Sequence, residues 1–175
     1  RAWKAGVAVV SGTTGWTSQL PEIKDEIAKN GYTLFWSSNF SLGVNLFFEL
    51  NKHLAKLMNQ FPAYNVTMKE VHHIHKLDAP SGTALTLVDG IISNLDRKDK
   101  WTLGTTATLN EIAIEALREG EVAGIHTVRY ESDADSIEIT HSAKNREGFA
   151  LGSVIAAEFV CGKKGFLTMN DLLKF

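Results

Sequence analysis

The first 38 residues contain a strand, a helix and a second strand in succession, and this order limits the fold more than any other feature. Gly6 to Val10 is a continuous apolar run, typical of a strand that is covered on both faces. A helix is predicted over Leu20 to Asn30, with Ser18 as its candidate N-cap and Gly31 beyond its end. Tyr32 to Trp36 is predicted to form the second strand. Strand–helix–strand units build parallel sheets, so this part predicts an α/β fold.

Beyond residue 39 the pattern changes to helices combined with a sheet that contains antiparallel pairs. A long helix is predicted over residues 42–60, and its leucines at positions 46, 50, 54 and 57 form an apolar stripe. The composition of Glu111 to Arg118 suits a helix, but its alternation favours a strand. The predicted helices cover 42–60, 83–95 and 146–160, and the predicted strands cover 65–76, 111–118, 124–131 and 136–141, the last two as a hairpin. Residues 165–173 are predicted to be a turn and tail.

Three histidines and a lysine lie within five residues, at His72, His73, His75 and Lys76. If the strand continues through them, alternation places His72 and Lys76 on one face and the other two histidines on the opposite face. A histidine can donate a proton near neutral pH, and a nearby lysine stabilises developing negative charge. The stretch therefore predicts a site that holds and protonates a small anionic substrate.

Two other interpretations of these histidines remain open. They can be ordinary polar residues that are satisfied within the fold. The His-His-x-His spacing also resembles a ligand cluster, because neutral imidazoles bind zinc well. Against a metal, adjacent histidines on a strand point to opposite faces, and Lys76 would repel a cation. We expect no metal here.

The residues after the histidines predict the start of a helix that faces an anion. Asp78 or Ser81 can cap this helix, and Gly82 lets a ligand approach the backbone. The N–H groups of Gly82, Thr83 and Ala84 lie at the positive end of the helix dipole and suit a carboxylate. Capping without a ligand is the alternative, but it leaves the preceding histidines unexplained.

Two small-residue turns follow the first two predicted strands: Gly12-Thr13-Thr14-Gly15 and Ser38-Asn39-Phe40-Ser41. Ligands of open α/β sheets bind at the carboxyl ends of the strands, and both turns lie at that edge. Together they suggest one lip of a nucleotide site. The dinucleotide fingerprint Gly-x-Gly-x-x-Gly is absent from the sequence.

Charge and composition exclude several classes of function. The formal net charge of −2 argues against a nucleic-acid surface, which normally carries a basic excess. No apolar run approaches the ~20 residues that a membrane helix needs. Cys161 is the single cysteine, so no disulfide can form within the chain, which fits a reducing cytoplasm. The first residues lack an initiator Met and a signal-peptide pattern, and we expect the chain to be a piece of a longer protein.

The stretch from Glu70 to Ala84 matches the signature Glu-x-His-His-x-x-Lys-x-Asp-Ala-Pro-Ser-Gly-Thr-Ala at every fixed position. On this motif the chain resembles 4-hydroxy-tetrahydrodipicolinate reductase, also called dihydrodipicolinate reductase, a family of bacterial lysine and diaminopimelate biosynthesis. Other segments resemble the family in the same order, namely 12–15, 38–45, 124–128 and 140–143, followed by Arg146, Phe149-Ala150 and Gly152. The resemblance covers nearly the whole chain.

The resemblance implies an NADH- or NADPH-dependent reduction of a cyclic unsaturated dicarboxylate to tetrahydrodipicolinate, with loss of water. His72 would be the general acid, and Lys76 the second proton-donating and charge-stabilising residue. His73 and the backbone of Gly82 and Thr83 would bind the substrate carboxylates. The nicotinamide half of the cofactor would contact the two turns through Gly12, Thr13, Thr14, Ser38, Asn39, Phe40 and Ser41.

The expected fold is α/β, with a partial Rossmann-like dinucleotide-binding domain over residues 1–41 and 146–175. Residues 42–145 would form an α+β domain with a mixed sheet, for substrate binding and assembly of a homotetramer. In its hairpin, four apolar residues are candidates to face a partner or to cover the chain's own helices: Ile125, Val128, Ile137 and Ile139.

The sequence departs from the family pattern in one respect. The family's Gly-rich cofactor loop is not among these 175 residues, so we expect this piece alone to bind NAD(P)H weakly and to turn over little. A competing interpretation is a module without catalysis that binds a dicarboxylate and oligomerises. Lys144 and Arg146 either help to hold a carboxylate or face solvent.

Overall fold

The computed structural model describes residues 1–174, and these divide into two compact units. Within the described residues, unit 1 comprises 1–45 and 147–174, and unit 2 comprises Leu46–Arg146. The expected domain boundaries, at residues 41/42 and 145/146, lie close to these divisions. The α/β class with a parallel sheet and a mixed sheet is confirmed. Among the described residues, no helix combines the length and apolar character needed to span a membrane.

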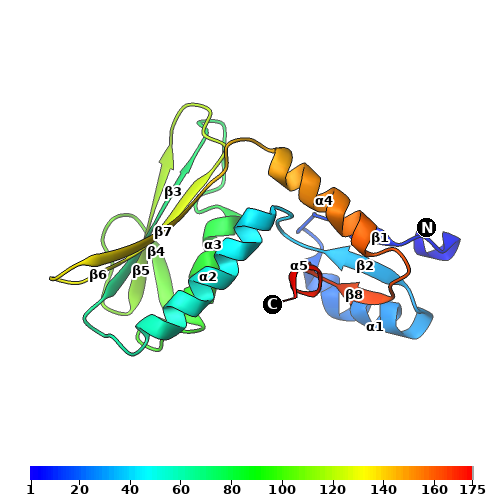
Figure 1. The fold of residues 1–175 in the computed structure, drawn as a ribbon, viewed down its shortest axis with the longest axis horizontal. Helices are drawn as coiled ribbons and strands as arrows, with labels where there is room; N and C mark the ends of the chain where they lie inside the picture. Colours follow the sequence, from blue (N-terminus) through cyan, green and yellow to red (C-terminus); the bar gives the residue numbers. More distant parts are fainter. Residues whose placement is uncertain (175) are drawn as a thin grey trace. The chain divides into compact units, whose positions relative to one another are not determined.

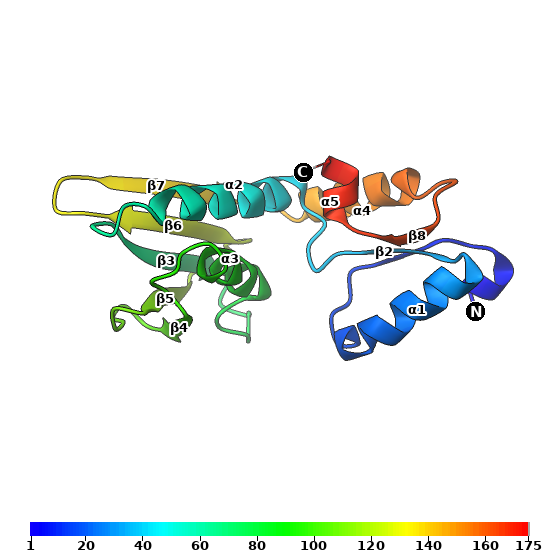
Figure 2. The same ribbon diagram turned by 90° about the horizontal axis from the view of Figure 1, so that it is seen from below.

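Unit 1 is a three-stranded parallel sheet with helices on both faces (Figures 1 and 2). The strand order is β1-β2-β8, and α1 covers one face while α4 and α5 cover the other. Its elements are the 3₁₀ turns η1 (Trp3–Ala5) and η2 (Thr17–Gln19), the strands β1 (Val9–Ser11), β2 (Thr33–Trp36) and β8 (Gly165–Leu167), and the helices α1 (Leu20–Asn30), α4 (Glu147–Phe159) and α5 (Met169–Leu173). Its core cluster comprises Phe35, Phe40, Ala156, Val160 and Met169.

The predicted strand–helix–strand order of unit 1 is confirmed, with two corrections. Ser18 does not cap α1, because residues 17–19 form a 3₁₀ turn and Gln19 takes the N-cap position. Gly31 ends the helix in the left-handed conformation, as the pattern indicates. The predicted tail is wrong: Gly165–Leu167 pairs with the open edge of β2, and Thr168 starts α5 with a capping box. A three-residue strand carries too little periodicity to be recognised from sequence.

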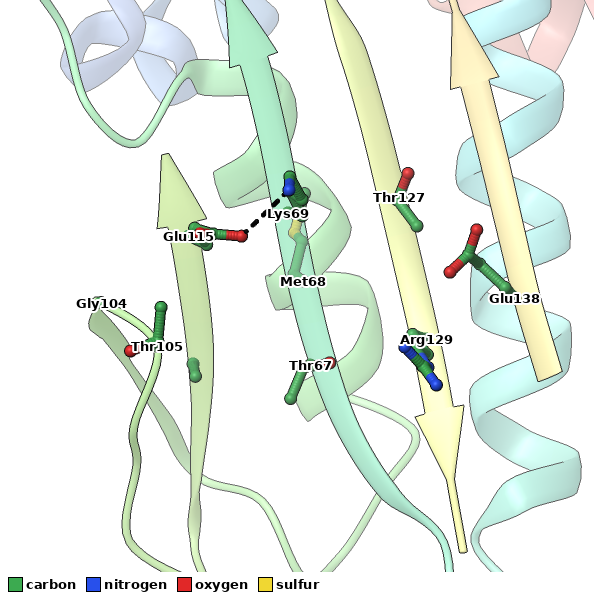
Figure 3. Close-up of a pocket in the computed structure, with 10 residues that line it drawn as sticks. Thr67, Met68, Lys69, Gly104, Thr105, Glu115, Thr127, Arg129 and Glu138 are labelled. Carbon is green, nitrogen blue, oxygen red and sulfur yellow. Dashed lines mark ion pairs between the residues drawn. The ribbon is translucent and has the colours of Figure 1, made fainter. Parts of the chain in front are cut away.

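Unit 2 is a five-stranded mixed sheet in the order β4-β5-β3-β6-β7, with two helices on one face (Figure 3). β3 runs parallel to β5 and antiparallel to β6. The helices are α2 (Leu42–Met58), which starts in unit 1, and α3 (Gly82–Ile92), and the strands are β3 (Asn65–His72), β4 (Lys100–Leu103), β5 (Glu111–Arg118), β6 (Ile125–Glu131) and β7 (Ser136–Ser142). The strand prediction for 111–118 and the hairpin are confirmed, whereas β4 was not predicted.

The predicted strand over residues 65–76 is too long, because β3 ends at His72. Both ladder partners stop there: β5 ends at Arg118, opposite His72, and β6 begins at Ile125, opposite Val71. Beyond His72 the regular ladder gives way to a turn: Ile74 N–H donates to Gly120 O at 3.1 Å, and Lys76 N–H donates to His73 O at 3.2 Å. The alternation that was expected to put His72 and Lys76 on one face therefore does not extend to Lys76.

Strand alternation decides which residues of the unit 2 sheet face the helices, and burial shows which face of α2 is packed. Val128 is fully buried beneath the helices, and its register partner Ile139 lies on the same face, as does Ile137 opposite Tyr130. Only Ile125 of the four hairpin candidates lies on the open face. In α2, Phe47 and Phe48 are buried, whereas three leucines of the predicted stripe are about half exposed: Leu46 (53%), Leu50 (52%) and Leu57 (47%).

Candidate active site

A carboxylate and an imidazole interrupt the apolar face of β3 that packs beneath the helices. Val66 and Met68 precede them on that face, at even positions of the strand. Glu70 then has no exposed surface, and His72 retains 7%. Buried charges are rare unless other groups compensate them, so this position marks a built polar cluster.

Polar groups from four segments surround the Glu70 carboxylate. Its two oxygens accept from the backbone N–H of Ser81 at 3.2 and 3.1 Å. His72 Nδ1 and His126 Nε2 lie 3.7 and 3.6 Å from Oε2, and Arg118 Nη1 lies 3.5 Å from Oε1. Burial raises the pKa of Glu70, but the interactions with His126 and Ser81 outweigh it and bring the pKa to about 2. Glu70 is therefore a permanent anion.

His72 is held neutral at ordinary pH. Burial is the main cause that lowers its pKa, and the positive charges of His126, Lys76 and Arg118 add to it, so that the pKa falls to about 4 even though Glu70 opposes the change. Its imidazole packs edge-on against His126, with 5.0 Å between ring centroids. A dianion bound nearby would favour the protonated form of this ring, because opposite charge raises the pKa of an imidazole.

Lys76 lies in the loop that follows β3. Its Nζ donates to both Asp78 carboxylate oxygens, at 2.7 and 2.8 Å, and this contact lowers the pKa of Asp78. Arg118 holds the same loop, donating from Nε to Lys76 O at 3.2 Å and from Nη2 to Asp78 O at 2.6 Å. Tertiary hydrogen bonds, rather than strand alternation, thus bring Lys76 within electrostatic reach of His72.

The predicted helix start after the histidines is confirmed, and Ser81 is its N-cap. The Ser81 hydroxyl accepts from Ala84 N–H at 3.2 Å and shares a second hydrogen bond with His126 Nε2 at 3.1 Å. Gly82 and Thr83 then form the first turn of α3. A Cβ at Gly82 would meet no atom within 4 Å, so a ligand can approach the helix N-terminus closely.

His73 lies apart from this cluster, in a cavity of ≈ 490 Å³ with a cationic lining. Arg146 Nη2 lies 3.4 Å from His73 Nε2, and Lys144 lines the same cavity. His75 also faces it and contacts Glu121 at 3.0 Å. The arrangement suits an anionic ligand. Neither His72 nor Lys76 is among the residues that line this cavity.

The candidate cofactor residues lie in unit 1, after β1 and β2. Gly12, Thr13 and Thr14 are exposed, and Thr13 is held by Trp16 Nε1, which donates to its hydroxyl, and by Trp36 Nε1, which donates to its carbonyl, both at 2.9 Å. The two turns thus lie at the carboxyl ends of adjacent parallel strands, the edge where open α/β sheets bind their ligands.

The second turn is more enclosed than expected. Ser38 is exposed, but Asn39, Phe40 and Ser41 are buried. Phe40 belongs to the core of unit 1, and Asn39 Oδ1 accepts from Ser41 N–H at 2.9 Å. These three residues shape the turn, and Ser38 is its accessible member.

A metal is not favoured by the geometry. Within residues 1–174, the group that could ligate one is Glu70, His72 and His126, whose ligand atoms lie within 4.8 Å of one another. Arg118 Nη1 lies 3.5 Å from the same carboxylate, and Ser81 N–H already donates to both of its oxygens. A cation there would meet a fixed positive charge. The His-His-x-His cluster of the sequence alternative is divided: His72 lies beside Glu70, whereas His73 and His75 line the cationic cavity.

The face of the unit 2 sheet that carries no helix is polar (Figure 3). It holds a hollow of ≈ 290 Å³ lined by side chains that include Thr67, Lys69, Glu115, Thr127 and Arg129. Lys69 Nζ lies 3.3 Å from Glu115, the contact drawn in Figure 3. Among the described residues, the buried Nε of Arg129 has no hydrogen-bond partner.

Sequence reasoning missed the roles of Glu70, Arg118 and His126 in this site. Glu70 had a detectable signal, since it is a carboxylate on the face of β3 that also carries Val66 and Met68. His126 occupies an even position of β6, and the even positions of this strand form its buried face. Arg118 carried no such signal, because its contacts depend on where the loop after β3 turns.

Comparisons with known proteins show which family this chain resembles. The family profile described as "Dihydrodipicolinate reductase, C-terminus" matches residues 43–173. The chain is 48% identical over 171 residues to 4-hydroxy-tetrahydrodipicolinate reductase of Christiangramia forsetii, covering 98% of this chain and 71% of the relative. It is 40% identical to the enzyme of that name from Methanococcus maripaludis, covering 98% and 65%. The chain thus spans about two thirds of the length of these relatives.

A solved structure has the same fold. It is that of dihydrodipicolinate reductase from Paenisporosarcina sp. TG-14 with dipicolinate bound. The TM-score is 0.73 at 23% sequence identity, and the match covers 97% of this chain and 66% of the other.

Proposed function

Because the chain belongs to the dihydrodipicolinate reductase family, we propose that it carries the proton-donating and substrate-binding part of a 4-hydroxy-tetrahydrodipicolinate reductase. The observation that carries the proposal is the cluster of His72, Glu70 and Arg118 next to the open N-terminus of α3. The full-length protein would reduce its substrate to tetrahydrodipicolinate in lysine and diaminopimelate biosynthesis. Such a role and the lone Cys161 favour a cytoplasmic location.

The chain's own residues account for charge and protons in the reaction. NADH or NADPH, when bound, supplies a hydride to the substrate. The N-terminus of α3, through the backbone of Gly82 and Thr83, is suited to one carboxylate, and the cationic cavity around His73 is suited to another. The substrate's negative charge favours a proton on His72, which can then deliver it to the reduced ring, while Lys76 stabilises charge that develops there.

The cofactor turns fit only half of a dinucleotide. We propose that Gly12, Thr13, Thr14 and Ser38 contact the nicotinamide half, and that Asn39, Phe40 and Ser41 shape the second turn. A Gly-rich phosphate-binding loop is absent from these 175 residues. Tight stoichiometric binding of NADH by this piece alone would contradict the expectation of weak cofactor affinity.

Arg146→Ala in the full-length protein is expected to weaken dipicolinate binding about 10–100-fold, because a charge-assisted hydrogen bond contributes about 1.5–3 kcal/mol. Dipicolinate is a suitable probe because the related solved enzyme binds it. Isothermal titration calorimetry measures the change, with Arg1→Ala as a control that removes the same charge from unit 1. An unchanged dissociation constant would show that Arg146 only faces solvent.

We further propose that copies of the chain assemble as a homotetramer through the open face of the unit 2 sheet. The unpartnered Arg129 Nε and the charged hollow of this face support a polar protein interface. Lys69→Glu places like charges opposite Glu115, and the tetramer is expected to dissociate into smaller species. Size-exclusion chromatography with light scattering measures the mass, with Lys29→Glu on α1 as the matched control. A wild-type monomer would contradict the proposal.

A further inference from the structure

Glu70 occupies a position where a charge is costly. It is fully buried in a row that otherwise carries Val66 and Met68, and a well-packed apolar residue there is often as stable as a buried ion pair. The roles proposed above for His72 and Lys76 do not use its carboxylate. A permanent anion at this place therefore calls for a reason other than packing.

The contacts of Glu70 join three parts of the proposed site. On one side lies the imidazole of His72, whose Nδ1 is 3.7 Å from Oε2. On another side the carboxylate accepts the N–H of Ser81, the N-cap of the helix whose first turn is suited to a substrate carboxylate. On the third side Arg118 lies 3.5 Å from Oε1 and also donates to the carbonyls of Lys76 and Asp78.

Glu70 also acts on the charge of His72. Of the charged neighbours that act on this imidazole, His126, Lys76 and Arg118 disfavour the protonated ring, and Glu70 alone favours it. β7, which pairs with β6, adds His141, whose pKa burial lowers, and an imidazole is neutral or cationic but not an anion. The negative charge of Asp78 is paired with the ammonium of Lys76, which donates to both of its carboxylate oxygens.

The Nε2 side of the ring is fixed as well. A Cβ at Gly124 would lie 3.2 Å from His72 Nε2, and this residue has φ +152, a conformation that glycine adopts readily. His126 stacks edge-on at the side of the ring. With Gly124 and His126 limiting its movement, the imidazole keeps Nδ1 toward Glu70.

We propose that Glu70 is a positioning residue for the proposed reduction: it orients His72, keeps that ring able to carry a proton, and through Ser81 and Arg118 fixes it relative to the helix N-terminus and to Lys76. This inference rests on the proposed function. Glu70 touches neither substrate nor cofactor in this scheme and acts only through other residues.

The test is Glu70→Gln in the full-length reductase, with kcat, KM and the pH dependence of kcat/KM. The acid must be protonated to work, so the rate falls as pH rises through the pKa of His72. Loss of an opposite charge at this distance lowers that pKa by about 1–3 units, so the high-pH limb moves to lower pH by the same amount. We expect kcat near neutral pH to fall about 10–100-fold, with a smaller change in KM.

Two further variants separate positioning from folding. Ser81→Ala removes the cap and the hydrogen bond to His126, which lowers stability, but keeps the Glu70 charge, so the high-pH limb is expected to stay in place. Glu70→Asp keeps the negative charge but moves it away from His72, because the side chain is one methylene shorter. This variant is expected to lower kcat and to shift the high-pH limb less than Glu70→Gln does. If Glu70→Gln does not fold, an unchanged kcat and limb in Glu70→Asp overturns the proposal.

The outcomes also separate this inference from the proposed function. If the wild-type protein does not reduce the substrate, the proposed function fails, and NMR titration of the His72 ring in wild type and Glu70→Gln still tests the effect of the charge. If the wild-type protein is active and Glu70→Gln lowers the melting temperature without moving the limb or the ring titration, Glu70 is structural only and the inference fails.

Discussion

His72→Ala in the full-length protein is expected to lower kcat about 10²–10⁴-fold and to change KM far less, because a general acid stabilises the transition state rather than the bound substrate. Lys76→Ala is expected to act in the same way, since its ammonium stabilises charge that develops during the reaction. Steady-state rates of NADH or NADPH oxidation measure both effects.

A matched histidine controls for the loss of an imidazole as such. His53→Ala removes an exposed ring from the surface of α2 and should leave kcat unchanged. The competing interpretation, a module that binds a dicarboxylate without catalysis, makes the opposite forecast. Under it, His72→Ala and Lys76→Ala would weaken dipicolinate binding and leave any turnover as it was.

Gly152→Ala is expected to destabilise unit 1 by about 3 kcal/mol or more, the upper part of the range for overpacking. Gly152 lies within α4, where its backbone packs directly against the turn that follows β2. A Cβ there would overlap the carbonyl oxygen of Phe40 and lie 2.7 Å from its carbonyl carbon. Backbone cannot move aside as a flexible side chain can, so the gain of about 1 kcal/mol that alanine brings to a helix is outweighed.

Gly148 in the same helix provides the control. A Cβ there would lie 3.8 Å from Ser41 Oγ, an ordinary contact, so Gly148→Ala should be neutral or stabilising by up to about 1 kcal/mol. Urea unfolding of the full-length protein, followed by circular dichroism, measures both free energies. Equal stability of the two variants would mean that α4 does not approach the Phe40 backbone this closely.

Periodic patterns in the sequence predicted most elements of the fold. The strand–helix–strand start, the long helix α2, the strand over 111–118 and the hairpin all follow from patterns that local residues carry. β4 and β8 were missed because strands of three or four residues have almost no period, and they form by pairing with an existing sheet edge. On α2 both leucines and phenylalanines are candidates for the buried face, and in the structure Phe47 and Phe48 are the buried ones.

The sequence by itself determined the chemical groups of the site and the capped helix start, because the motif from Glu70 to Ala84 and the Ser81 cap are local in the chain. Only the tertiary structure decided how these groups meet. β3 ends at His72, where its regular pairing with β5 ends, and a hydrogen bond from Arg118 rather than strand alternation holds the loop that carries Lys76. The Glu70 carboxylate likewise acquires its role from β5, β6 and α3, and such long-range contacts have no signature in the local pattern.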